Sequence, residues 1–163
     1  MPEDTMDALA ARIELLLEQD GWARTREEIA GLGPSAVPIL IAKIEQGGPE
    51  LKFIERAVLA LGEIGGSEAQ AFLATLLDHE NPILRAAAVT ALGQAGGVGH
   101  AQAVHNLLSD EDGAVRKEAA RTLAKIGDEN SIEPLESLAR DEGQRFLKEE
   151  AQGAVEEIKK RQA

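Results

Sequence analysis

Three stretches of the chain decide its fold: IERAVLALGEIG at residues 54–65, RAAAVTALGQAG at 85–96 and RKEAARTLAKIG at 116–127. They align without gaps at a spacing of 31 residues, and each places alanine, leucine and glycine at the same three positions. A repeat period of about 20–50 residues indicates stacked supersecondary units rather than one globular core.

Apolar residues recur every three or four positions along almost the whole chain, with glycine and proline between the runs. This is the period of amphipathic helices, and no window alternates apolar and polar residues as a strand would. The pattern predicts ten helices, at about residues 4–19, 24–32, 34–46, 50–64, 67–78, 82–95, 99–109, 113–126, 130–140 and 144–161.

The predicted helices pair as antiparallel hairpins. We therefore expect an all-α, right-handed α-solenoid of about ten helices, forming a single domain over residues 1–163. Residues 1–48 would form irregular N-terminal repeats, 49–141 regular repeats and 144–161 a C-terminal capping helix. The last helix has one apolar stripe and is otherwise polar, which suits a terminal unit because its outer face meets water.

The stretch AVRKEAARTLAKIGD at residues 114–128 resembles the HEAT-like repeat, of the type named after phycobilisome lyases. The resemblance covers roughly residues 22–160 and implies the same solenoid fold. In that family an arginine at the start of the first helix bridges neighbouring repeats, and Arg85 and Arg116 stand at this position here. Ile54 and Lys148 replace it in the flanking repeats, so we expect less regular polar bridging at both ends.

The composition is acidic, with 17 Lys and Arg against 29 Asp and Glu and a formal net charge of −12. A polyanion needs a cationic surface, so nucleic acid and anionic membranes are disfavoured as partners. The charge favours basic partners, although the same charge could serve solubility alone. There is no cysteine, which excludes disulfides, thiolate catalysis and cysteine-based zinc sites.

The N-terminus lacks a signal-peptide pattern, and no apolar run approaches the ~20 residues of a membrane span. We therefore expect a cytoplasmic protein, monomeric or weakly dimeric. The histidines His79, His100 and His105 do not share metal-ligand spacing, and the clustered carboxylates lie in turns or on polar helix faces. The sequence predicts no catalytic residue, no cofactor and no metal site.

The resemblance implies that the second helix of each pair lines the concave face, where ligands are usually held. The polar side of these helices and the turns after them give a predicted binding surface, in which His79, Asp110 and Asp141 recur at 31-residue spacing along one edge. The surface consists of Glu68, Phe72, Thr75, Asp78, His79, Gln102, Asn106, Asp110, Glu133, Ser137 and Asp141.

These features favour a non-enzymatic scaffold or adaptor that binds a basic protein or peptide segment through its concave face. A solvated inner face without a ligand is the plain alternative. The resemblance also implies a second function, a bilin lyase or lyase subunit acting on a phycobiliprotein. A DNA-binding or repair role, known for some helical-repeat proteins, would need a cationic groove and is disfavoured by the acidic charge.

Overall fold

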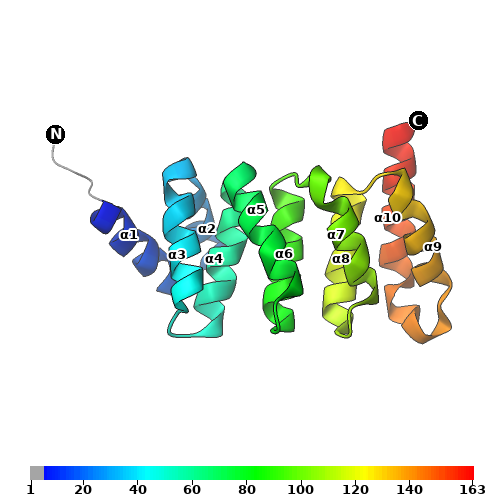
Figure 1. Ribbon diagram of the computed structural model, residues 1–163, viewed down its shortest axis with the longest axis horizontal. Helices are drawn as coiled ribbons and strands as arrows, with labels where there is room; N and C mark the ends of the chain where they lie inside the picture. The colour runs from blue at the N-terminus through cyan, green and yellow to red at the C-terminus, as the bar shows by residue number, and fades with distance from the viewer. Residues whose placement is uncertain (1–5) are drawn as a thin grey trace.

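The computed structural model describes residues 6–163, which contain ten α-helices, six short 3-10 helices and no strand (Figure 1). The α-helices are α1 (Met6–Glu18), α2 (Trp22–Ala30), α3 (Val37–Gln46), α4 (Leu51–Ile64), α5 (Ser67–Thr75), α6 (Pro82–Gln94), α7 (Ala101–Asn106), α8 (Gly113–Ile126), α9 (Ile132–Arg140) and α10 (Lys148–Gln162). This arrangement confirms the predicted all-α solenoid. The predicted start of the first helix at residue 4 lies outside the described residues.

Several helices are less regular than predicted. The predicted helix 99–109 is a six-residue α7 between the 3-10 helices η3 (Val98–His100) and η4 (Leu107–Ser109). Glycines at 97 and 99 weaken helix formation at its start, because glycine loses more backbone freedom than other residues. The predicted helix 144–161 likewise divides into η6 (Glu142–Leu147) and α10, with a non-helical backbone at Gln144.

The helices stand side by side in a row, with α1 at one end of the stack, α9 and α10 at the other, and α1 tilted against the others (Figure 1). The first helices of successive repeats, α4, α6, α8 and α10, pack directly on one another. The second helices α5, α7 and α9 have few contacts with each other. α7 and α9 pack mainly on the first helix that follows them, whereas α5 packs on both α4 and α6. The layer of first helices is therefore closely packed, and the layer of second helices is open.

Small residues allow the first-helix layer to pack so closely. A Cβ atom at Gly62 would lie 2.6 Å from the Cα of Ala91, so only glycine permits the present distance between α4 and α6. Gly93 lies close to Thr122 of α8, but its hypothetical Cβ would meet only side-chain atoms, the nearest being the threonine Cγ2 at 3.1 Å. Backbone contact therefore fixes the spacing of α4 and α6 in particular.

The core is the continuous stripe of apolar residues that the repeat predicts. Leu61, Leu92 and Leu123 of the first helices are fully buried. Leu73, Val104 and Leu135 of the second helices are fully buried opposite them. Burial of each such side chain contributes about 1.5–3 kcal/mol to stability relative to an exposed position. Because the stripe continues from one repeat to the next, successive repeats share one core.

Polar bridging at the N-terminal flank comes from a residue outside the repeat register, in keeping with the less regular bridging expected from Ile54. Arg56, two residues further along, is buried and donates hydrogen bonds from Nη1 to the carbonyls of Leu17 (2.6 Å) and Gln19 (2.8 Å). Its guanidinium also lies 5.5 Å from the centre of the Trp22 ring. An arginine outside the repeat register thereby fastens the C-terminal end of α1 to α4.

At the C-terminal flank the bridging comes from the end of α10 instead of from Lys148. Arg161 donates hydrogen bonds to the carbonyl oxygens of Ala124 and Gly127 at the end of α8. Lys159 pairs with Glu136 of α9 at 3.0 Å. Basic side chains near both helix C-termini also complement the helix dipoles.

Candidate functional site

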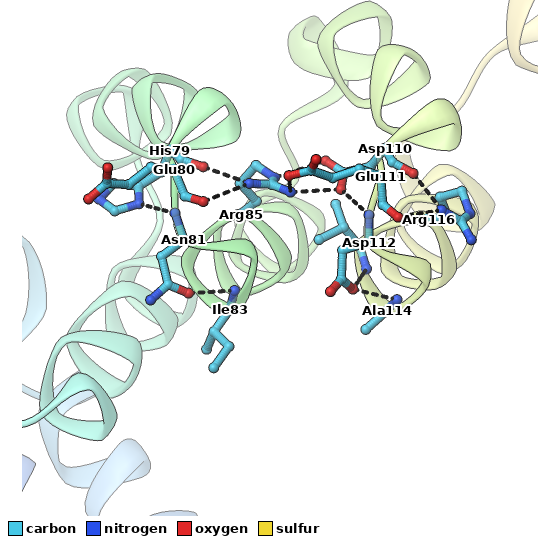
Figure 2. A network of polar contacts seen from close by, with 11 residues as sticks. His79, Glu80, Asn81, Ile83, Arg85, Asp110, Glu111, Asp112, Ala114 and Arg116 are labelled. Atoms are coloured by element: carbon cyan, nitrogen blue, oxygen red, sulfur yellow. Dashed lines mark hydrogen bonds and ion pairs between the residues drawn. The ribbon is translucent and has the colours of Figure 1, made fainter.

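The turns between repeats use His79, Asp110 and Asp141 in the same way. Each side chain accepts a hydrogen bond from the backbone N–H two residues later: His79 Nδ1 from Asn81 (2.9 Å), Asp110 Oδ1 from Asp112 (2.8 Å) and Asp141 Oδ1 from Gly143 (2.8 Å). Figure 2 shows the first two of these turns side by side. The three residues therefore occupy equivalent turns at the 31-residue spacing, and their acceptor atoms are used to close these turns.

Arg85 joins the first two turns to each other. Its Nε and Nη2 donate to the two carboxylate oxygens of Asp110, both at 2.8 Å, and its Nη1 donates to the carbonyls of His79 (2.9 Å) and Glu80 (3.1 Å) (Figure 2). The side chains of Arg85 and Asp110 are 8% and 6% exposed. A bidentate guanidinium–carboxylate pair is a strong and geometrically specific contact.

The environment shifts the pKa values of both partners. Burial alone would raise the pKa of Asp110, but hydrogen bonds from Arg85 and from the Asp112 N–H, together with the charges of Arg85 and Arg116, outweigh it and lower that pKa. The hydrogen bond to Asp110 raises the pKa of Arg85 despite its burial. Both groups stay charged and neutralise each other, so Asp110 presents no free charge to a ligand.

Arg116 repeats this arrangement with a different partner. It donates to the carbonyls of Asp110 and Glu111, and its Nε reaches Gln144 Oε1 at 3.1 Å rather than a carboxylate. Among the described residues, no basic side chain lies within 4 Å of the Asp141 carboxylate. Asp141 is therefore exposed and unpaired, in contrast to Asp110.

The rest of the predicted second-helix surface is exposed and dispersed. Phe72 is partly buried and packs against the core. A groove of about 410 Å³ between η4 and α9 brings together Asp110, Ser137 and Asp141 with Arg116 and Gln144. The predicted residues that lie exposed and outside this groove are Glu68, Thr75, Asp78, Gln102, Asn106 and Glu133. That these residues form one binding surface stays a prediction.

A buried histidine–serine pair was not anticipated. His105 of α7 is 9% exposed, and its Nε2 lies 2.5 Å from Oγ of the fully buried Ser131. The Ser131 hydroxyl also accepts from the Asp128 N–H (3.0 Å) and donates to the Asp128 carboxylate (3.3 Å). Burial lowers the pKa of His105, and the charge of Asp128 partly opposes this.

This set has the residue types of a catalytic Ser–His–Asp arrangement, but its geometry is that of a helix cap. The hydroxyl of Ser131 is fully buried and closes a reciprocal capping box with Asp128 at the start of η5 (Glu129–Ser131). A nucleophile must reach a substrate carbonyl, and this one has no access to solvent. The set fixes the packing of α7 against η5.

A second groove, of about 430 Å³, lies on the opposite side of the molecule from the second helices, on the first-helix layer. We call it the first-helix groove. Its floor comes from α6, and α4 and α8 form its two walls. It is lined by Glu55, Leu59, Pro82, Ile83, Ala86, Ala87, Thr90, Asp112, Ala114 and Glu118.

Differences within the repeat create this groove. Ala86 and Thr90 of α6 stand at the positions that hold Glu55 and Leu59 in α4 and Lys117 and Arg121 in α8. The short side chains of α6 therefore lie between longer ones, of which Lys117 and Arg121 pair with Glu150 and Glu118 and do not line the groove. This difference in side-chain length is visible in the aligned repeats, but the binding surface was predicted on the second helices.

The groove is apolar along its floor and acidic at its edges. Ile83 is 45% exposed within it. All three charged residues that line it, Glu55, Asp112 and Glu118, are acidic. Glu118 receives partial compensation from Arg121 at 2.9 Å and from the Thr90 hydroxyl at 3.3 Å.

Residues 6–163 contain neither a metal-binding cluster nor a membrane-spanning helix. That part of the chain holds no group of three or more His, Cys, Asp or Glu side chains arranged to bind a metal ion. None of its helices has the length and apolar character needed to cross a bilayer.

A family model of HEAT repeats matches residues 37–103 and 70–156 of the sequence. Together the two matches extend over residues 37–156, well over half of the chain. The chain belongs to the HEAT-repeat family. Comparison of this HEAT-repeat protein with curated proteins gave no match.

Solved structures similar to this HEAT-repeat protein include human deoxyhypusine hydroxylase in complex with glycerol, with 25% identity and a TM-score of 0.65 over 77% of this chain. The match covers 44% of the hydroxylase, so this chain spans less than half of its length. An engineered protein is 21% identical with a TM-score of 0.55, over 91% of this chain and 78% of its own. The CpcE–CpcF phycocyanin lyase complex from Nostoc is 18% identical with a TM-score of 0.42, over 95% and 78%.

Proposed function

We propose that this HEAT-repeat protein is a non-catalytic scaffold that binds a basic segment of another protein on its first-helix layer. The observation that carries the proposal is the first-helix groove, which combines an exposed apolar floor with acidic edges. Protein-binding surfaces commonly have an apolar centre within a polar rim. The overall charge of −12 adds a long-range attraction for basic partners.

The packing of the two layers supports the first-helix layer as the inner side of the solenoid. In a curved stack the inner helices are closer together than the outer ones. The first helices touch at Gly62 with Ala91 and at Gly93 with Thr122, whereas α5, α7 and α9 have few contacts with each other. We therefore favour the first-helix layer over the second-helix surface that the resemblance implies.

A zero-length carbodiimide cross-linking experiment tests the proposal. This reagent joins a carboxylate to an amine in direct contact with it, so exposed acids of the chain would be linked to lysines of a bound protein. The full chain is incubated with a cell extract, and the linked peptides are identified by mass spectrometry. We expect partner peptides rich in Lys and Arg, linked to carboxylates of α4 and α8.

Links that arise evenly from all exposed carboxylates would overturn the proposal, as would partner peptides that are neutral or acidic. The variant Glu68→Lys serves as a matched control, because Glu68 is an exposed glutamate of the second-helix layer. It changes the net charge as much as Glu55→Lys does but leaves the groove intact. Only Glu55→Lys should reduce the yield of linked partner.

The bilin-lyase alternative stays a prediction without an observation in its favour. Its test is direct: the chain is mixed with a bilin and an apo-phycobiliprotein, and the absorbance spectrum is followed. We expect no change in absorbance beyond that of the mixture without the chain. A covalent bilin adduct formed only in the presence of the chain would establish the alternative and overturn the scaffold proposal.

A further inference from the structure

The groove has the proportions of a site for a short helix. Its floor runs along α6 from Ile83 to Thr90, about 10 Å at 1.5 Å per residue, which equals two helical turns. The walls belong to α4 and α8, which both pack directly on α6, and packed helices generally lie about 8–10 Å apart. α4 and α8 are thus separated by twice the distance between neighbouring helices. The space between them above α6 suits one further helix, about 10 Å across.

The floor favours close approach by another helix. Ala86, Ala87 and Thr90 carry short side chains, and Ile83 projects as an exposed apolar contact at one end. Short residues at a contact allow two helices to approach closely, and Leu59 extends the apolar surface towards α4. A ligand helix would place its own apolar residues at i, i+3, i+4 and i+7 on this floor.

The walls place carboxylates at matching levels on both sides. In the 31-residue register Glu55 of α4 corresponds to Ala86, and Glu118 of α8 corresponds to Ala87. Glu55 and Glu118 therefore flank the middle of the floor from opposite walls, and Asp112 lies near its Ile83 end. Basic side chains on the two flanks of a bound helix would meet these three carboxylates.

The same charges disfavour a second copy of this chain as the occupant. Each copy carries a net charge of −12, and an acidic surface would meet acidic walls. Like charges brought together at an interface oppose association.

We propose that the first-helix groove binds an amphipathic helix of a partner protein, about two turns in contact, with an apolar stripe on α6 and Lys or Arg on both flanks facing Glu55, Asp112 and Glu118. This inference rests on the proposed function and makes it specific. It names the conformation of the basic segment and the residues that hold it.

A displayed library of peptides about 16 residues long, enough for four helical turns, provides the probe. The library is selected on the wild-type chain and then counter-selected on a Glu55→Lys/Ile83→Arg variant. We expect enriched peptides with apolar residues at helical spacing and Lys or Arg on either side. A synthetic copy of the most enriched peptide is then measured by fluorescence anisotropy.

Two pairs of variants keep the measurement interpretable. Glu55→Lys is compared with Glu68→Lys, and Ile83→Arg with Val98→Arg, because Val98 is an exposed apolar residue (63%) outside the groove. We expect each groove variant to raise the Kd of the peptide at least tenfold and each control variant to change it less than twofold. Ile83→Ser replaces Ile83→Arg if circular dichroism shows that the arginine variant does not fold.

The outcomes separate this inference from the function on which it rests. Enriched basic peptides without helical spacing, or peptides that become no more helical on binding, would overturn the proposal that the ligand is a helix. They would leave the proposal of a basic partner unaffected. Equal loss in groove and control variants would overturn the groove as the site. The absence of any enriched basic peptide would overturn both.

Discussion

Arg85 and Asp110 belong to successive repeats, and their bidentate contact ties the turn before α6 to the turn before α8 (Figure 2). Asp110 also closes its own turn, as Asp141 does one repeat later without an arginine partner. The two aspartates therefore form a natural matched pair. One has a turn contact and an ion pair, and the other has the turn contact alone.

The first prediction concerns this pair. Asp110→Ala should lower the free energy of unfolding by about 3 kcal/mol, because it leaves the buried Arg85 with only the exposed Glu111, at 3.4 Å, as a counter-ion. Asp141→Ala should cost about 1 kcal/mol, the usual value for a lost cap. Urea denaturation of both variants at pH 7 measures the difference, and equal costs would contradict the account of Arg85.

The same contact predicts a dependence on acid. The pKa of Asp110 is lower in the folded state than its usual value near ~4, so its stabilisation is complete above that value. It is lost as the pH falls through the lower folded-state pKa. The stability difference between wild type and Asp110→Asn should thus be constant from pH 7 to about 5 and shrink below pH ~4.

His105 predicts a separate loss of stability at mildly acidic pH. Its folded-state pKa is lowered, so the protonated form is favoured in the unfolded chain. The native state should lose stability as the pH falls below about 6.5, by up to ~1.4 kcal/mol per pH unit. Denaturation between pH 8 and 5 should show this slope in the wild type and a flatter one in His105→Gln. Parallel profiles would contradict the prediction.

Two helical glycines should respond in opposite directions to the same substitution. Gly62→Ala forces a methyl group to within 2.6 Å of the Ala91 backbone, and we expect a loss of about 1–3 kcal/mol. Gly153 of α10 faces open space, so Gly153→Ala should increase stability by about 1 kcal/mol through helix propensity. Thermal denaturation of the two variants checks both signs.

The second-helix surface can be tested independently of the groove. Glu133→Lys/Asp141→Lys reverses two exposed charges on α9 and the turn after it. If basic segments bind on the first-helix layer, this double variant should bind the selected peptide with a Kd within twofold of the wild-type value at physiological salt. A tenfold loss would move the site to the surface that the sequence predicts.

The fold was predictable because the repeat places apolar residues at equivalent positions of successive helices. Leu61, Leu92 and Leu123 share one position, and all are fully buried in the core. The use of polar atoms was not predictable in the same way. The repeat identifies His79 and Asp110 as equivalent, but it does not show that both close turns or that Asp110 alone receives an arginine. Those facts depend on side-chain direction in three dimensions.

Arg56 illustrates the same limit from the other side. Register alone points to Ile54, and a search confined to equivalent positions finds no arginine there. The side chain two residues later nevertheless reaches Leu17 and Gln19, since a long arginine can come from a neighbouring turn of the helix. The groove was missed for a related reason: it depends on how side-chain lengths differ between adjacent helices rather than on which residues recur.

The contact of Gly62 with Ala91 has a kinetic consequence. Because backbone atoms set the distance between α4 and α6, a ligand meets a floor whose shape does not have to form during encounter. Preorganised surfaces save the cost of ordering on binding. Association should therefore follow a single exponential whose rate rises linearly with ligand concentration, with no slower step from a rearranging receptor.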